Sequence, residues 1–212
     1  GSWVGLGSRR LSILDLSDAG HMPMQNQDGS VVVTYNGEIY NYPELREELE
    51  SKGYRFRSRS DTEAPLYLYD QDGVDWVRRL NGMFAFAIWD QLRQQMFVAR
   101  DHFGIKPLYF TVRSHRVAFA SEAKSLLCLP GFERRINYNA LHQYMSFLWV
   151  PVPLTMFDGI RKLPAGHYGV VRNGEFTVTQ YWDMTFPPGG HDFGSCNGTL
   201  VKELRDRFDN VV

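Results

Sequence analysis

One stretch of this sequence is apolar at every position, Met83-Phe-Ala-Phe-Ala-Ile-Trp89. A strand with one face in water would alternate apolar and polar residues, so an unbroken apolar run indicates a strand that is covered on both faces. Such a strand needs a further layer of structure on each side of its sheet. Apolar residues make up 43% of the 212 residues, which is enough to fill a core of this kind.

Strands and helices are predicted to alternate along most of the chain. Besides residues 83–89, strands are expected at 10–15, 30–35, 54–57, 95–100, 108–112 and 116–120. Helices are expected at 42–52, from Asp61 through Tyr69, at 123–129 and at 138–148. In the first helix, Asn41 is the predicted N-cap and Gly53 the stop. Asn173-Gly174 predicts a two-residue turn in a hairpin of residues 168–172 and 176–181.

The last part of the chain differs in composition. Residues 186–198 are rich in Pro, Gly and Ser, which is typical of a linker, and a helix is predicted from residue 199 to residue 212. A helix that begins directly after a linker belongs to the structure that follows it. We therefore expect the chain to end at a domain boundary.

Charge and composition exclude several classes of function. The formal net charge is −1, so no basic excess favours nucleic acid as a partner. No apolar run reaches the roughly 18–20 residues that span a bilayer, and the chain start lacks a signal-peptide core, so no membrane partner is expected. The histidines lack metal-binding spacing, and we expect no metal site. Cys128 and Cys196 are expected to be reduced thiols of a cytoplasmic protein, and neither is expected to be a nucleophile.

Asn36 and Gly37 follow a β-type run in the sequence Val33-Thr-Tyr-Asn-Gly-Glu38. An Asn side-chain amide and the next Gly N–H make a good pair of donors for an oxyanion, and Gly lets a ligand approach the backbone. The alternative is a hairpin turn, which Asn-Gly also favours. The motif alone leaves both open.

Two charged motifs have a structural and a functional interpretation. Asp61, in Ser60-Asp-Thr-Glu63, either caps a helix or offers a carboxylate that binds an ammonium group. Arg10, in the Arg9-Arg10 pair, is either a surface residue or a bidentate partner for a carboxylate ligand. The charged residues between Arg100 and Tyr109 could form a structural network or a contact with another domain, and we favour the structural network.

Seven motifs in order resemble one family, and the resemblance extends from about Gly7 to Trp182. They start at Arg10 (Arg-Leu-Ser-Ile-Leu-Asp-Leu-Ser), Tyr35 (Tyr-Asn-Gly-Glu-Ile-Tyr-Asn), Phe56 (Phe-Arg-Ser-Arg-Ser-Asp-Thr-Glu), Leu80 (Leu-Asn-Gly-Met-Phe-Ala-Phe-Ala), Arg100 (Arg-Asp-His-Phe-Gly-Ile-Lys-Pro-Leu-Tyr), Ala120 (Ala-Ser-Glu-Ala-Lys) and Ile160 (Ile-Arg-Lys-Leu-Pro-Ala-Gly). The chain resembles the class II glutamine amidotransferase domain of glutamine-hydrolysing asparagine synthetases. The resemblance implies an α+β fold, a four-layer αββα sandwich of the N-terminal-nucleophile hydrolase type.

The resemblance also implies a set of glutamine-binding residues. Arg10 should hold the α-carboxylate, and Leu11, Ser12, Ile13 and Leu14 should line the pocket. Glu38 and Asp61 should bind the α-ammonium group. Asn36 and Gly37 should form the oxyanion hole for attack by the family's N-terminal cysteine thiolate. The ammonia released would pass to a C-terminal synthetase domain, which would use ATP and magnesium to convert aspartate to asparagine; no cofactor is expected in the present domain.

The sequence departs from the family pattern at its start, where the Cys-Gly pair and the several dozen residues that normally precede the Arg-Leu-Ser strand are absent. On this basis we expect residues 1–185 to be an N-terminally truncated amidotransferase domain. Residues 186–212 would be the linker and first helix leading to a synthetase domain of the same polypeptide, and the parent could form a homodimer. Two alternatives stay open, an amidotransferase domain serving another acceptor and a glutamine-binding module without catalysis.

The first prediction concerns activity of the 212-residue chain by itself. Because no thiolate is placed to attack, we expect it to release no ammonia from glutamine, although the oxyanion donors are present. Ammonia release would be measured for the chain and for its Asn36→Ala variant as the matched background. Release by the unmodified chain above that background would contradict the prediction.

Overall fold

The computed structural model describes residues 4–9, 20–113, 116–186 and 198–209. Its strands are β1 (Met24–Gln25), β2 (Val31–Ile39), β3 (Gly82–Asp90), β4 (Gln95–Arg100), β5 (Tyr109–Arg113), β6 (Arg116–Ala120), β7 (Arg161–Lys162), β8 (His167–Arg172) and β9 (Glu175–Gln180). Its helices are α1 (Tyr42–Ser51), α2 (Glu63–Asp72), the 3-10 helix η2 (Asp75–Arg79), α3 (Ala123–Leu126), α4 (Tyr138–Phe147) and α5 (Gly198–Asp209).

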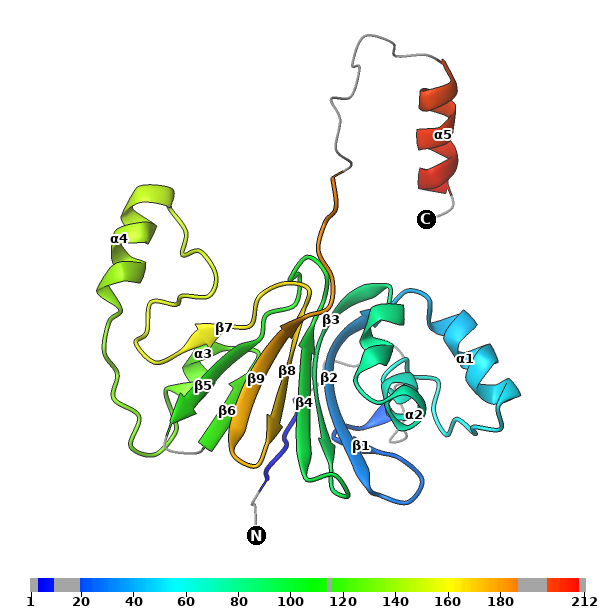
Figure 1. Ribbon diagram of the computed structural model, residues 1–212, viewed down its shortest axis with the longest axis horizontal. Helices are drawn as coiled ribbons and strands as arrows, with labels where there is room; N and C mark the ends of the chain where they lie inside the picture. The colour runs from blue at the N-terminus through cyan, green and yellow to red at the C-terminus, as the bar shows by residue number, and fades with distance from the viewer. Residues whose placement is uncertain (1–3, 10–19, 114–115, 187–197, 210–212) are drawn as a thin grey trace.

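The strands form two antiparallel sheets. The larger has the order β1-β2-β3-β4-β8-β9 and the smaller the order β6-β5-β7. Figure 1 shows α1 and α2 on one side of the larger sheet and the smaller sheet toward its other side. The α+β class expected from the sequence is confirmed.

Strand β3 is covered on both faces, as its unbroken apolar sequence predicts. Phe84, Phe86 and Ile88 belong to the core between the larger sheet and the helices. Ala85 and Ala87, which point the other way, belong to a second core that includes Leu108 and Phe110 of the neighbouring sheet region. The larger sheet is therefore the central layer of the described structure.

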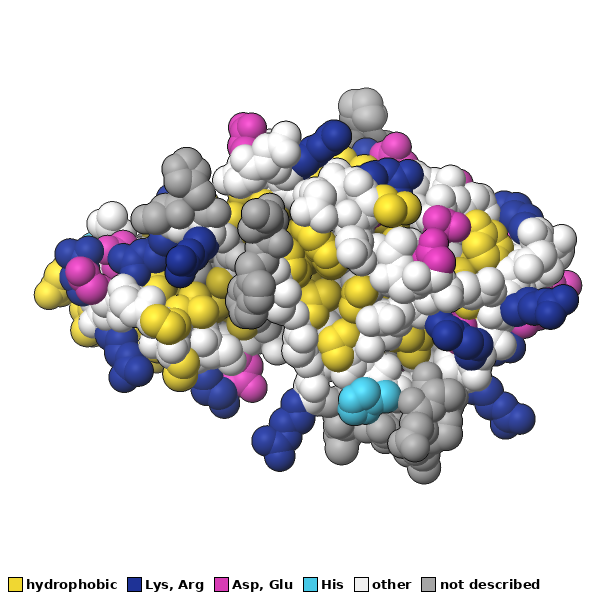
Figure 2. Space-filling model, turned by 90° about the horizontal axis from the view of Figure 1, so that it is seen from below, with side chains coloured by type: hydrophobic (Ala, Val, Ile, Leu, Met, Phe, Trp, Pro, Cys, Tyr) yellow, Lys and Arg dark blue, Asp and Glu magenta, His cyan; other side chains and the backbone are white. Residues whose placement is uncertain are grey.

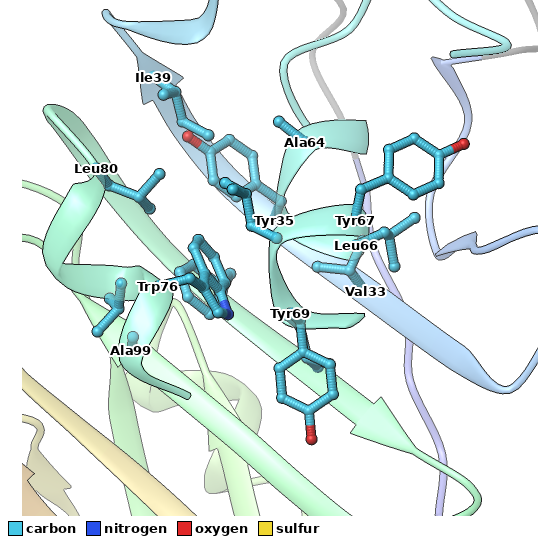
Figure 3. Close-up of a cluster of buried hydrophobic side chains, with 14 of the residues drawn as sticks. Val33, Tyr35, Ile39, Ala64, Leu66, Tyr67, Tyr69, Trp76, Leu80 and Ala99 are labelled. Atoms are coloured by element: carbon cyan, nitrogen blue, oxygen red, sulfur yellow. The ribbon is translucent and has the colours of Figure 1, made fainter. Parts of the chain in front are cut away.

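The helix-side core is dominated by aromatic side chains (Figure 3). Trp76 of η2 is fully buried and stacks on Phe86 of β3, with ring centroids 5.2 Å apart. Tyr35 of β2 also stacks on Phe86, with ring centroids 6.4 Å apart. Large rings of this kind bury much apolar area, and their stacking fixes how η2 and β2 sit on the sheet.

Most predicted elements match the structure within a few residues, but the Asn-Gly motif does not form a turn. Strand β2 continues through Asn36 and Gly37 to Ile39, so the hairpin-turn interpretation is wrong. The hairpin around Asn173 is confirmed, since Asn173 and Gly174 have φ of 53° and 79°, as a tight two-residue turn requires. The predicted strand at 10–15 lies outside the described residues.

One other local prediction is wrong, and another is confirmed only in part. Residues 54–57 form no strand, because Tyr54 and Phe56 pack their rings against Tyr67 of α2, with centroids 5.0 and 5.1 Å away. Asn41 is the N-cap residue of α1, as predicted, but its side chain makes no cap bond. Its amide instead donates to the Arg79 carbonyl and its Oδ1 accepts from the Asn81 N–H, each at 2.9 Å, so it ties α1 to the start of β3.

The network around Arg100 is structural, as the sequence predicts. The Arg100 guanidinium donates to the carbonyl oxygens of Lys106, Leu163 and Gly104 at 2.6–2.7 Å. The fully buried Asp101 carboxylate accepts four backbone N–H groups, from Phe84, Phe103, Ile105 and Lys106, at distances of 2.9–3.2 Å. Together they fix the segment that leads from β4 to β5.

Helix α4 leaves an apolar surface exposed. Ala140 is its one buried side chain, whereas Met145 and Phe147, with Leu148 and Trp149 just beyond the helix, are 57–80% exposed. In the part of the chain that the structure describes, no helix combines the length and apolar character needed to cross a membrane.

Strands β2 and β3 approach each other closely at two glycines. A Cβ atom at Gly37 would overlap the Met83 carbonyl oxygen, and one at Gly82 would overlap the Glu38 carbonyl oxygen. Both obstacles are backbone atoms, which cannot move without distorting the ladder. Glycine at these two positions therefore sets the spacing of the strands at the end of β2.

We expect Gly82→Ala to lower the free energy of unfolding by about 1–3 kcal/mol, the usual penalty for overpacking. The measurement is urea denaturation of both proteins. Gly7→Ala is the matched control, because a Cβ atom at Gly7 meets nothing within 4 Å. If both alanine variants unfold at the same urea concentration, the close approach does not constrain this ladder.

Candidate functional site

A cleft of about 1930 Å³ lies against the face of the larger sheet that is turned away from α1 and α2. Residues from both sheets line it, and so do Asn36, Gly37, Glu38 and Asp61. Figure 2 shows hydrophobic side chains in the middle of the molecule's lower face and many Lys and Arg side chains nearer its edges. The structure thus brings four predicted site residues from two segments to the wall of one cleft.

Strand alternation explains how β2 presents its polar residues. Val33, Tyr35 and Ile39 are buried on the helix side, so Asn36 and Glu38 project from the opposite face. Gly37 lies between them and also lines the cleft, and a side chain at this position would meet the backbone of β3. An amide, a backbone segment without a side chain and a carboxylate therefore occupy three successive positions.

A second carboxylate, Glu63, shapes the loop that carries Asp61. Glu63 is 1% exposed and accepts from the backbone N–H groups of Arg57 and Ser58, the Ser58 hydroxyl and the Tyr67 hydroxyl, at 2.7–2.9 Å. These bonds fold the chain before α2 back on the helix. The loop conformation follows from them, and with it the position of Asp61.

Asp61 is directed at the end of β2. Its Oδ2 accepts from the Ile39 N–H at 2.9 Å, and its side chain is buried. The N-cap residue of α2 is Thr62, with no side-chain cap bond. The helix-capping interpretation of Asp61 is therefore wrong, and its carboxylate belongs to the cleft.

Burial and neighbouring charge make this end of the cleft favourable for a cation. Burial first, and the charge of Glu38 to a lesser extent, raise the pKa of Asp61 to about 6 against the opposing effect of the Ile39 hydrogen bond. Burial, followed by the charges of Asp61 and Glu38, also holds the pKa of Tyr35 well above its ordinary value. A bound ammonium group would offset the repulsion between the two carboxylates.

Two residues of this arrangement were not singled out from the sequence. Tyr35 lies beside Asp61, and Glu63 organises the loop before it. The alternation of β2 indicates that Tyr35 is buried, but not that a carboxylate from another segment meets it. Glu63 reads equally well as an ordinary acidic residue in a first helical turn.

The remaining predicted residues are distributed as follows. Arg9 lines the cleft, whereas Arg10, Leu11, Ser12, Ile13 and Leu14 lie outside the described residues. Cys128 is exposed and far in sequence from the cleft motifs, and Cys196 lies outside the described residues. Within the described ranges, no three His, Cys, Asp or Glu side chains are grouped so as to hold a metal ion.

Comparison with known families matches residues 1–182 to the model of the glutamine amidotransferase domain. The chain belongs to this family. It is a class II glutamine amidotransferase domain, as the resemblance noted from the sequence implies.

Relatives of this amidotransferase domain include larger proteins. Asparagine synthetase 1 (glutamine-hydrolyzing) of Bacillus subtilis strain 168 is 43% identical over 210 residues, covering 98% of the chain and 32% of the relative. Amidase chry2 of Gibberella zeae is 37% identical over 185 residues, covering 87% of the chain and 27% of the relative. The chain thus spans about a third of the length of these relatives.

Solved structures agree with the amidotransferase fold. The glutamine phosphoribosylpyrophosphate amidotransferase of Bacillus subtilis, complexed with ADP and GMP, matches with a TM-score of 0.53 and 19% identity, covering 76% of this chain and 32% of that one. An allosteric regulatory enzyme of purine biosynthesis matches with a TM-score of 0.56 and 18% identity, covering 82% and 34%. At these identities the match supports the fold alone.

The raised pKa of Asp61 predicts a stability cost at neutral pH. The folded pKa of about 6 exceeds the ordinary value of 3.8, so the folded protein binds more protons between these values. The contribution of Asp61 to the free energy of unfolding therefore falls as the pH rises from 3.8 to about 6, and it stays at its lowest value above that range. Asp61→Asn, which keeps an acceptor for the Ile39 N–H, should raise the free energy of unfolding by roughly 2–3 kcal/mol at pH 7.5.

Urea denaturation at pH 4 and pH 7.5 checks this, because the gain should be much smaller at pH 4, where the folded Asp61 is protonated and the unfolded one is only about half ionised. Asp70→Asn on the exposed side of α2 is the control. A gain of equal size at both pH values would show that ionisation of Asp61 is not its cause.

Proposed function

We propose that this domain binds glutamine and hydrolyses its amide to supply ammonia, as the glutaminase part of an asparagine synthetase. The observation that carries the proposal is the convergence of Asn36, Gly37, Glu38 and Asp61 on one cleft. The 43% identity to a glutamine-hydrolyzing asparagine synthetase over 98% of the chain supports it. In the parent protein, the ammonia would serve the ATP-dependent conversion of aspartate to asparagine.

The chemistry of glutamine suits this arrangement. Its α-ammonium group would lie between Glu38 and Asp61, and its α-carboxylate would be bound by Arg10, with residues 11–14 lining the pocket. Its side-chain amide would then reach Asn36 and Gly37. Those donors would stabilise the oxyanion formed when a cysteine thiolate attacks the amide carbon.

The covalent step splits amide hydrolysis into two. A carbon–sulfur bond forms, the carbon–nitrogen bond breaks, and the departing nitrogen takes up a proton and leaves as ammonia. Water then cleaves the thioester and releases glutamate. In the family this thiolate is that of an N-terminal cysteine, which is neither Cys128 nor Cys196 of this chain.

The other parts of the proposal concern the parent protein. Its relatives are about three times as long as this chain, and we propose that the additional length contains a synthetase domain that uses ATP and magnesium. The exposed apolar residues of α4 give such a domain a surface to contact. We further propose a cytoplasmic parent and the four-layer sandwich for the complete amidotransferase domain.

A second candidate is an amidotransferase domain that serves another acceptor. The 37% identity to amidase chry2 favours it, because a domain of this kind also occurs in a protein with a different name and role. Glutamine binding would be the same in both cases. Amination of free aspartate by the parent, with either glutamine or ammonia as donor, separates the two.

We expect Asp61→Ala and Arg10→Ala in the complete enzyme to raise the KM for glutamine and to leave ammonia-dependent synthesis intact. Free ammonia bypasses the glutamine pocket, so a pocket residue affects one nitrogen source alone. Asn36→Ala should instead lower the glutaminase kcat by roughly 10²–10³, the usual effect of losing one oxyanion donor.

The measurement is steady-state kinetics with glutamine and with ammonium chloride. Asp70→Ala, an exposed aspartate of α2, is the matched control and should change neither reaction. Equal losses with both nitrogen sources would place the effect of these substitutions outside glutamine binding.

A further inference from the structure

The Tyr35 hydroxyl is a buried polar group without a hydrogen bond. Tyr35 is 5% exposed and lies with Ile39 in the aromatic core beside α2 (Figure 3). Among the described residues, its oxygen has no hydrogen-bond partner. A buried hydroxyl without a hydrogen-bond partner is unfavourable and uncommon, so the presence of one at Tyr35 needs an explanation.

The charged group that acts most strongly on Tyr35 is Asp61. Its carboxylate is bound to the N–H of Ile39, which lies four residues beyond Tyr35 on the same face of β2. The phenol and the carboxylate are close enough for Asp61 to act on the pKa of Tyr35 through its charge and through a weak hydrogen bond, but the two groups do not form a hydrogen bond of full strength. A small rotation of either side chain would bring a phenol donor to a carboxylate acceptor.

Among the described residues, the charged groups that act most strongly on Tyr35 are acidic. Glu38 of β2 and Asp101, beyond β4, act on Tyr35, and Tyr42 of α1 is itself affected by Asp61. The carboxylate of Glu63, from α2, is already satisfied by its loop. Tyr35 is thus a neutral donor in surroundings dominated by negative charge.

We propose that Tyr35 is a positioning residue for Asp61. The Tyr35 hydroxyl donates to the Asp61 carboxylate whenever that carboxylate is ionised, and so keeps it charged in the free protein and oriented toward the α-ammonium group of an amino acid in the cleft. This inference rests on the proposed function, because it takes an amino acid to be the ligand.

The physical reason is the conflict between burial and charge at Asp61. Burial disfavours the carboxylate form, and a donor from Tyr35 favours it. Since the pKa of Tyr35 lies well above its ordinary value, the phenol keeps its proton throughout the working pH range and always remains a donor. Removing the hydroxyl should therefore make Asp61 ionise at a higher pH and weaken ligand binding mainly on the acid side.

The first test does not require a ligand. The Asp61 carboxyl carbon is titrated by NMR in the 212-residue chain and in Tyr35→Phe, with its signal identified by its loss in Asp61→Asn. We expect the midpoint to rise by about one pH unit in Tyr35→Phe. Tyr69→Phe is the matched control, since the Tyr69 hydroxyl bonds Asp90 in the same core and should leave Asp61 unchanged. An unchanged or lowered midpoint in Tyr35→Phe overturns the proposal.

The second test measures glutamine binding by calorimetry at pH 5.5 and pH 8. Tyr35→Phe should weaken binding close to tenfold at pH 5.5 and less than about twofold at pH 8, because Asp61 is then ionised in both proteins. Equal weakening at both pH values would indicate a packing role and overturn the inference. If the unmodified chain binds no glutamine at either pH, the proposed function fails, and the Asp61 titration still decides the role of Tyr35.

If Tyr35→Phe does not fold, the role of the Tyr35 hydroxyl can be tested by NMR in the unmodified protein. The Tyr35 hydroxyl proton should become visible by NMR as a slowly exchanging downfield signal when glutamine is added. If the signal of the Tyr35 ring does not respond to glutamine that is shown to bind, the hydroxyl does not take part and the proposal falls.

Discussion

Asp101 joins three parts of the chain that are distant in sequence. Its carboxylate binds the backbone of β3 at Phe84 and the backbone of its own loop at Phe103, Ile105 and Lys106. Its backbone N–H donates to the Phe84 carbonyl, and its carbonyl accepts from Gly166 before β8. A single buried charge with this many donors replaces its lost hydration by fixed dipoles. The position of β3, on which the neighbouring strands depend, follows from this arrangement.

The candidate site is assembled outward from β3. Glycines 37 and 82 let β2 lie close against it, and the alternation of β2 then turns Asn36 and Glu38 to the cleft. On the other side, Glu63 folds the loop that brings Asp61 to the end of the same strand. Two acidic side chains are thus held near each other at some expense in stability, which is common where a site must bind a cation. In the structure without ligand the carboxylates of Glu38 and Asp61 repel each other, and a bound cationic group would offset that repulsion.

The sequence predicts elements well where local signals and tertiary packing agree. The apolar run of β3 and the Asn173-Gly174 turn are examples, since each has one physical interpretation. Predictions failed where contacts between distant segments decide the outcome, as for Asn36-Gly37, which pairs with β3 instead of turning. For the site, the sequence indicated Asn36, Gly37, Glu38 and Asp61 through a family resemblance, but Tyr35 became visible only when β2 and the loop before α2 were placed together. The role of Arg10 stays a prediction.

Complete burial of Asp101 has a consequence for how the medium acts on this protein. Dissolved ions weaken the field of a charge only where they can approach it, and they cannot approach a side chain with no exposed surface. Ion pairs on the surface, such as Arg46–Glu50, weaken as ionic strength rises. The field of Asp101, which acts on the phenols of Tyr35 and Tyr181, persists in dilute buffer and concentrated salt alike. The electrostatic character of the interior beside the cleft is therefore a property of the fold and not of the surrounding solution.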